Sequence, residues 1–108
     1  MSSTPVDLTL RVVECLRPVL PKGSRVAVFG SCARGDAASD SDIDLLVLEP
    51  EVPDRHREMS RLSRLLGRQL IPADVVVMST RAFDEQRDIV NSLAWRVVRE
   101  GQWHEFPA

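Results

Sequence analysis

The chain has 108 residues, of which 44% are hydrophobic and 28% are charged, and its formal net charge is -2. This length predicts one domain, spanning 1–108, with a single hydrophobic core. The slightly acidic balance excludes the general attraction to nucleic acid that a DNA-binding protein needs, and no apolar stretch is long enough to cross a membrane. With no N-terminal signal-like segment and no metal-ligand spacing of its two cysteines, the sequence predicts a cytoplasmic protein.

The first half of the chain is predicted to form one helix and two strands. A capping residue, a proline at the first helical position and apolar residues at helical spacing, Leu10 among them, predict a helix over 5–19. The Pro-Lys-Gly sequence at 21–23 ends this helix. Apolar runs then predict strands over 25–29 and 42–48.

The second half continues the alternation of helices and strands. An amphipathic helix is predicted over 54–70, followed by a strand over 73–78 whose three consecutive valines indicate burial on both faces. A last helix is predicted over 80–100, with an irregularity at 91–92, and a short edge strand over 102–106. This order of elements favours an α/β (α+β) fold over an all-α fold.

The amphipathic helix carries a row of arginines opposite its apolar face. The basic positions are Arg57, Arg61, Arg64 and Arg68. Such a row is either a face that is simply solvated or a docking surface for an acidic partner or an RNA backbone, and the residues alone do not decide between the two.

Two aspartates mark the start of the second predicted strand. Asp42 and Asp44 follow the Gly-Ser pair at 30–31 after a gap of ten residues. Because successive side chains of a strand point to opposite faces, both carboxylates are expected on the same face. Two carboxylates that close repel each other unless a cation lies between them, and oxygen ligands favour magnesium or manganese. The pair therefore predicts a divalent-cation site.

A third acid, Asp74, lies at the start of the strand predicted over 73–78. It has two interpretations that spacing alone leaves open. It is either a hydrogen-bonding residue of the turn after Pro72, or a third carboxylate at the same end of the sheet as Asp42 and Asp44.

Taken together, the segments 30–35, 41–47 and 72–76 resemble the signature of the DNA polymerase β-type nucleotidyltransferase superfamily. The likeness is greatest to its smallest members, the minimal nucleotidyltransferases (MNT). The Gly-Ser pair, the ten-residue gap, the Asp-Ile-Asp sequence and the later Pro-Ala-Asp-Val-Val sequence carry it, and it extends over the whole chain. The fold that this resemblance implies is a small mixed β-sheet backed by helices.

The resemblance also implies the reaction and its metal ligands. An acceptor hydroxyl would attack the α-phosphate of ATP, and AMP would be transferred as pyrophosphate leaves. Two magnesium ions would be held by Asp42, Asp44 and Asp74, and Asp74 would also take the proton of the acceptor hydroxyl.

The nucleotide-binding residues are expected in the segment after the first strand. Gly30 allows the tight turn and close approach to the triphosphate, and Ser31 offers its hydroxyl and backbone N–H to phosphate oxygens. Arg34 is the nearest cation of the motif, and it either contacts the phosphates or forms an ion pair with an acid of its own loop.

The acceptor is implied by the same resemblance. Minimal nucleotidyltransferases that resemble this chain are commonly encoded beside HEPN-domain ribonuclease toxins and act as their antitoxins by transferring AMP to a tyrosine of the toxin. Two alternatives stay open: an antitoxin that acts by binding alone, and the catalytic subunit of a two-chain nucleotidyltransferase for a small molecule or RNA. No role on DNA is expected, because the chain has neither a basic balance nor a helix-hairpin-helix pattern.

Overall fold

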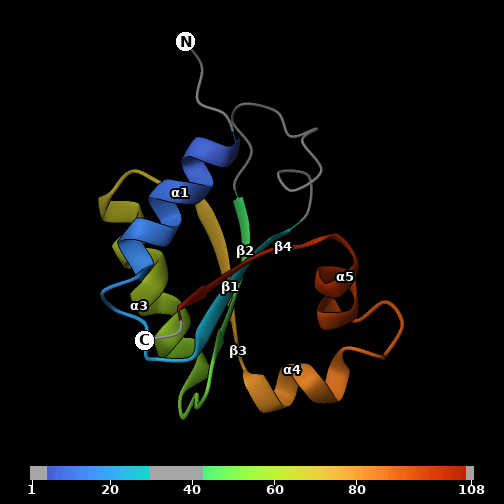
Figure 1. Ribbon diagram of the computed structural model, residues 1–108. Helices are drawn as coiled ribbons and strands as arrows, with labels where there is room; N and C mark the ends of the chain where they lie inside the picture. Colours follow the sequence, from blue (N-terminus) through green and yellow to red (C-terminus); the bar gives the residue numbers. More distant parts are fainter. Residues whose placement is uncertain (1–4, 30–42, 107–108) are drawn as a thin grey trace.

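The computed structural model describes residues 5–29 and 43–106, which form one sheet with helices on both of its faces (Figure 1). In chain order the elements are α1 (Pro5–Leu16), β1 (Ser24–Phe29), β2 (Ile43–Glu49), α3 (Arg55–Arg68), β3 (Ala73–Ser79), α4 (Thr80–Gln86), α5 (Leu93–Glu100) and β4 (Gln102–Phe106). None of the helices in these two ranges is long and apolar enough to cross a membrane. The predicted α/β fold class is confirmed.

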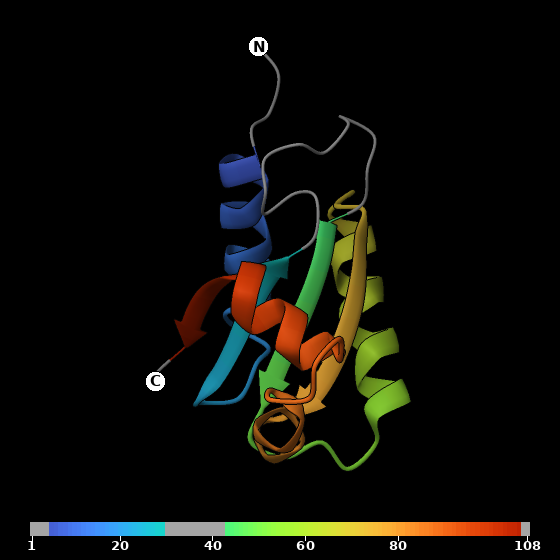
Figure 2. The ribbon, with the colours of Figure 1, turned by 90° about the vertical axis from the view of Figure 1, so that its right-hand side faces the viewer.

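The strands form a mixed sheet in the order β3-β2-β1-β4. β1 runs antiparallel to both of its neighbours, β2 and β4, whereas β2 and β3 are parallel. Parallel neighbours need a crossover connection, and α3 supplies it. β2 and β3 therefore start at the same end of the sheet, the upper end in Figure 2. β4 is an edge strand, as the sequence predicted.

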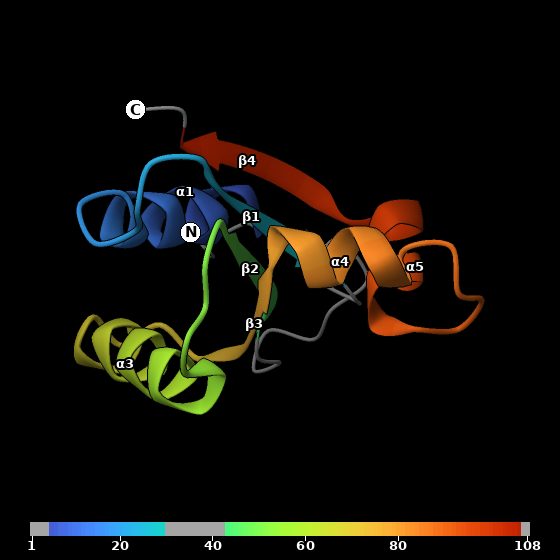
Figure 3. The same ribbon diagram turned by 90° about the horizontal axis from the view of Figure 1, so that it is seen from below.

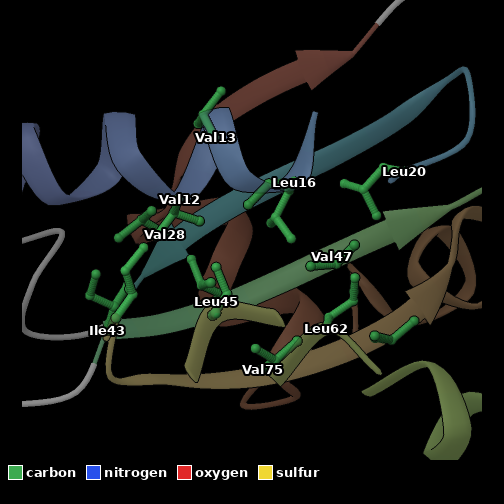
Figure 4. Packing of buried hydrophobic residues seen from close by; sticks show 14 residues of the cluster. Val12, Val13, Leu16, Leu20, Val28, Ile43, Leu45, Val47, Leu62 and Val75 are labelled. Atoms are coloured by element: carbon green, nitrogen blue, oxygen red, sulfur yellow. The ribbon is translucent and has the colours of Figure 1, made fainter. Parts of the chain in front are cut away.

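Two helices cover each face of the sheet. Viewed along the sheet from below, α1 and α3 lie on one side and α4 and α5 on the other (Figure 3). The first face is packed by alternate residues such as Val28, Leu45 and Val47, which meet Leu16 and Leu62 of the helices (Figure 4). The intervening residues of the strands pack the second core under α4 and α5. The sheet is thus buried from both sides.

β2 is the strand most completely enclosed. Leu45, Leu46, Val47 and Leu48 all have an exposed fraction of 0%. Full burial of each such side chain stabilises the fold by about 1.5–3 kcal/mol, so this short run contributes a large share of the hydrophobic stabilisation. The consequence is a rigid central strand whose two ends are held in fixed positions.

The first helix ends earlier than predicted. α1 stops at Leu16 rather than at 19, because Pro18 disfavours helical geometry in the residue before it and has no N–H for a helical bond. Leu10, expected in the core, is 54% exposed, while Val12 and Leu16 are buried. Val13 and Leu20, which share the predicted spacing with Leu16, are also buried, so Leu10 alone departs from the predicted core face.

The end of α3 also differs from the prediction. The helix ends at Arg68, and Leu70 adopts a left-handed conformation with φ of 59° and an exposed fraction of 86%. The N–H of Leu70 donates to the Gly67 carbonyl and that of Ile71 to the Leu66 carbonyl, both at 3.0 Å. These are the two bonds of a Schellman motif, with leucine at the position that usually holds glycine.

The helix predicted over 80–100 is two helices. Asn91, with φ of 70°, is left-handed and breaks the run after α4. Ser92 then caps α5, since its hydroxyl oxygen accepts from the Trp95 N–H at 3.1 Å and its hydroxyl donates to the Gln86 carbonyl at 2.9 Å. The irregularity indicated at 91–92 is thus a full break, which lets α4 and α5 pack separately on the sheet.

Candidate functional site

Asp44 and Asp74 are direct neighbours across the two parallel strands. Each is the second residue of its strand, and the register pairs Asp44 of β2 with Asp74 of β3. Neighbouring strands lie about 4.8 Å apart, so the two aspartate backbones are held at about that separation. Because Asp74 lies inside β3, it is not a residue of the turn after Pro72. Of its two interpretations, the structure supports the carboxylate that joins Asp44 at one end of the sheet.

Both aspartates belong to the same face of the sheet. Asp44 alternates with Leu46 and Leu48, and Asp74 alternates with Val76 and Met78, all of which pack under α4 and α5. Asp44 is half-buried and Asp74 is exposed. The two carboxylates therefore lie together at the end of the sheet where β2 and β3 begin, beyond the apolar core and accessible from solvent.

The end of the sheet that carries the two aspartates is fixed by backbone pairing and by burial. The Ile43 N–H donates to the Pro72 carbonyl at 3.0 Å, which ties the start of β2 to the start of β3. Ile43 itself is 1% exposed and anchors the strand in the core under α1 and α3. On the other side, Phe29 is paired with Asp44, so β1 ends where β2 and β3 begin.

The remaining predicted site residues lie outside the described residues. These are Gly30, Ser31, Arg34 and Asp42. Their predicted roles in holding the nucleotide and the metal stay predictions. In the sequence, Gly30 directly follows the last residue of β1 and Asp42 directly precedes the first residue of β2.

The chemistry of this edge fits a hard divalent cation. Asp44 and Asp74 offer carboxylate oxygens, which magnesium and manganese prefer. Within residues 5–29 and 43–106, no three histidine, cysteine, aspartate or glutamate side chains form a metal cluster. The described part of the site therefore provides two of the three predicted carboxylates, and Asp42 is the predicted third.

A second group of charged residues, at the other end of β2, was missed by the sequence analysis. Glu49 is 4% exposed, and burial together with the neighbouring Glu58 raises its pKa to about 8. Glu58 in turn has a lowered pKa, because Arg61 donates two hydrogen bonds to its carboxylate. At neutral pH, Glu49 is thus a protonated carboxyl beside an ionised one.

The alternation of the strand could have revealed Glu49. It follows an unbroken apolar run and shares its parity with Leu45 and Val47, which face α1 and α3. An acid at that parity is directed towards a covered face of the sheet. Its partner Glu58 is on α3, a connection that the sequence does not show.

The basic row on α3 is mostly solvated. Arg57, Arg64 and Arg68 are exposed. Arg61 instead pairs with Glu58 at 2.6 Å and reaches the Val19 carbonyl at 3.4 Å. Part of the row is thus used inside the protein, and its other arginines lie at the surface.

The sequence matches a known family and a curated relative. The family described as the nucleotidyltransferase domain matches residues 11–100. Protein MJ0141 of Methanocaldococcus jannaschii, to which protein adenylyltransferase activity is attributed, is 36% identical over 56 residues. That alignment includes 52% of this chain and 56% of the relative, so the chain matches little more than half the length of MJ0141.

Solved structures share the fold. A chain from a toxin-antitoxin crystal structure with AMP-PNP superposes with a TM-score of 0.64 at 25% identity, covering 87% of this chain and 69% of that one. A structure attributed to a minimal nucleotidyltransferase is 31% identical, with a TM-score of 0.52 and coverage of 93% and 95%. A chain from the complex of tri-AMPylated Shewanella oneidensis HEPN toxin with MNT antitoxin is 22% identical, with a TM-score of 0.52 and coverage of 93% and 71%.

Proposed function

Because the chain belongs to the nucleotidyltransferase domain family, we propose that it transfers AMP from ATP to a hydroxyl of a partner protein. The proposed acceptor is a tyrosine of a HEPN-domain toxin, and the transfer inactivates that toxin, so that this protein acts as its antitoxin in the cytoplasm. The single observation that carries the chemistry is the register that sets Asp44 beside Asp74.

The described residues suit this reaction. The acceptor oxygen forms a bond to the α-phosphorus of ATP, the bond from that phosphorus to the β-phosphate oxygen breaks, and pyrophosphate leaves. Asp74, the exposed member of the pair, receives the proton of the acceptor hydroxyl. Asp44, Asp74 and the predicted third ligand Asp42 would hold two magnesium ions, which supply positive charge beside the reacting phosphate when they are bound.

The choice of acceptor rests on the relatives. Protein adenylyltransferase activity is attributed to MJ0141, and the Shewanella oneidensis complex pairs an MNT antitoxin with an AMPylated HEPN toxin. The toxin-antitoxin structure with AMP-PNP adds an adenine nucleotide analogue. These likenesses favour AMP as the transferred group and a HEPN protein as the acceptor.

The proposal is tested by labelling. The protein is incubated with magnesium, ATP labelled at the α-phosphate and the HEPN protein proposed as its partner, and label on the HEPN protein is measured. We expect labelling by the wild type and by Asp88→Asn, a control that removes an exposed carboxylate in the turn before α5. Asp44→Asn and Asp74→Asn are expected to lose the label.

The same experiment distinguishes transfer from inhibition by binding alone. If transfer is the mechanism, Asp44→Asn still binds the HEPN protein but no longer lowers its ribonuclease activity. An unlabelled partner that is nevertheless inhibited by both wild type and Asp44→Asn would contradict the proposal and identify a binding antitoxin.

A further inference from the structure

A small pocket lies at the end of the sheet opposite to the two aspartates. It forms where β2 passes through the loop at 50–54 into α3, at the end of the molecule that faces the viewer in Figure 3. Its volume is about 290 Å³, and four carboxyl groups and one guanidinium line it. The acidic side chains are Glu49, Glu51, Asp54 and Glu58, and the basic one is Arg57.

Glu49 differs from the other acids because it is buried and one of its two carboxyl oxygens has no hydrogen-bond partner. Its exposed fraction is 4%, and its Oε2 atom has no hydrogen-bond partner among the described residues. The backbone cannot carry it out to solvent, since Glu49 is paired with Ser79 of β3 and the Thr80 hydroxyl donates to its carbonyl at 3.5 Å. A buried polar atom without a partner costs free energy until a ligand meets it.

Two of its acidic neighbours are already engaged. Glu58 accepts two hydrogen bonds from Arg61, at 2.9 and 2.6 Å. Asp54 caps α3 by accepting from the Arg57 N–H at 3.1 Å. Neither arrangement supplies a donor to the buried oxygen of Glu49, so the pocket holds acidic oxygens in excess of the donors that its own residues provide.

We propose that this pocket binds the charged end of an arginine or lysine side chain from a partner protein, with Glu49 as its buried counter-ion. The excess of carboxyl groups matches a cation in charge. Val52 and Pro53 form an apolar part of the wall, of the kind that packs against the methylene stem of a basic side chain. This site goes beyond the proposed transfer reaction and does not depend on it.

Binding exchanges the cation for a proton. With a pKa raised to about 8, Glu49 carries a proton at neutral pH, which is released when the arriving cation pairs with the carboxylate. The charged groups that surround it are Glu58 and Arg61 from α3 and the rim residues Glu51, Asp54 and Arg57. Below that pKa, the apparent affinity for the cation should rise about tenfold for each unit of pH.

The test is a titration of the whole chain with n-butylguanidinium chloride at constant ionic strength, in which NMR records the amide chemical shifts at each concentration. We expect saturable shifts confined to residues 49–58, and an affinity about tenfold higher at pH 7.5 than at pH 6.5. Glu49→Gln should lose at least about tenfold in affinity, since its amide cannot become the carboxylate that pairs with the cation. Glu105→Gln, a matched loss of one exposed charge on β4 outside the pocket, should stay within about twofold.

Three results would overturn the proposal. The first is equal binding by Glu49→Gln and the wild type, and the second is an affinity that does not change with pH. The third is tighter binding of spermidine than of n-butylguanidinium, which would identify a free polyamine, and not a side chain, as the source of the cation. If Glu49→Gln does not fold, the pH dependence of binding by the wild type still tests the proposal. None of these measurements needs ATP or an acceptor, so a negative result for this pocket leaves the transferase proposal unaffected.

Discussion

Asp44 and Glu49 occupy opposite ends of the same strand and meet opposite environments. Four residues of β2 lie between them, and the five steps along the strand span about 17 Å. Asp44 faces α4 and α5, has Asp74 beside it and is open to solvent at an edge. Glu49 faces α1 and α3, is 4% exposed and has Glu58 beside it.

The comparison shows that the surroundings of two neighbouring acids decide whether they can bind a cation or share a proton. At the open end, two carboxylates can offer oxygens to a cation from solution. At the closed end, burial favours the neutral form, and the acids share a proton instead. The proposed transfer reaction is assigned to the open end, and the closed end is a separate feature of the strand.

The largest expected effect is the loss of transfer at the open end. Asp44→Asn should lower the rate of AMP transfer at least about a hundredfold, because an amide is a poor ligand for magnesium. The thermal midpoint should stay the same or rise, because the change removes a like charge beside Asp74. A steady-state labelling assay and a thermal scan measure the two. Near wild-type turnover in this variant would remove the metal site from the account.

The next largest effect should be the loss of stability when a buried side chain in the middle of β2 is truncated. Leu46→Ala truncates a side chain that is 0% exposed. Leu46 is two residues after Asp44 and lies on the same face of β2. The loss of burial and the cavity left behind should cost about 2–5 kcal/mol in the free energy of unfolding. Urea unfolding measures this cost. Leu10→Ala, at an exposed position of α1, is the control and should cost far less.

At the closed end, stability should depend on pH. The folded pKa of Glu49, about 8, is above its ordinary 4.5, so the folded state binds this proton more tightly than the unfolded state does. The stability that it contributes is complete below pH 4.5 and is lost as pH rises through 8. The thermal midpoint of the wild type should therefore fall from pH 6 to pH 9. In Glu49→Gln, whose amide imitates the protonated carboxyl, the fall should be smaller; an equally steep fall would assign the pH dependence to other groups.

The smallest effect concerns the end of α3 that lies towards the open end of the sheet. Leu70 holds a left-handed conformation that glycine adopts without steric cost, and its side chain is 86% exposed. Leu70→Gly should therefore raise the free energy of unfolding, by about 0.5–1 kcal/mol. Chemical denaturation resolves a change of this size. A loss of stability on this substitution would show that the exposed leucine side chain makes a contribution that its surroundings do not reveal.

The sequence predicted the kinds and order of the elements because periodicity reports which faces are buried. It predicted the edge strand at 102–106 and the strand that carries Asp74, both of which the structure confirms. It misjudged the element ends, since Pro18 and the left-handed residues Leu70 and Asn91 act locally against a pattern that continues past them.

Pairing across the sheet could not be derived from residue spacing. Nothing in the spacing says that Asp44 and Asp74 stand in register, because that depends on how the crossover through α3 returns the chain. The family resemblance supplied the expectation that they meet. The contact of Glu49 with Glu58 was missed for the same reason, since the packing of α3 against the sheet brings it about.

The central claim, that Asp44 and Asp74 form one cation site at one end of the sheet, is tested most directly by paramagnetic NMR. Manganese is added with ATP, and the broadening of each amide signal is recorded for the wild type and for Asp74→Asn. We expect residues 43–45 and 73–75 to broaden together, residues 49 and 58 to be much less affected, and Asp74→Asn to weaken the broadening on both strands. Broadening of β2 alone, unchanged by Asp74→Asn, would contradict the claim.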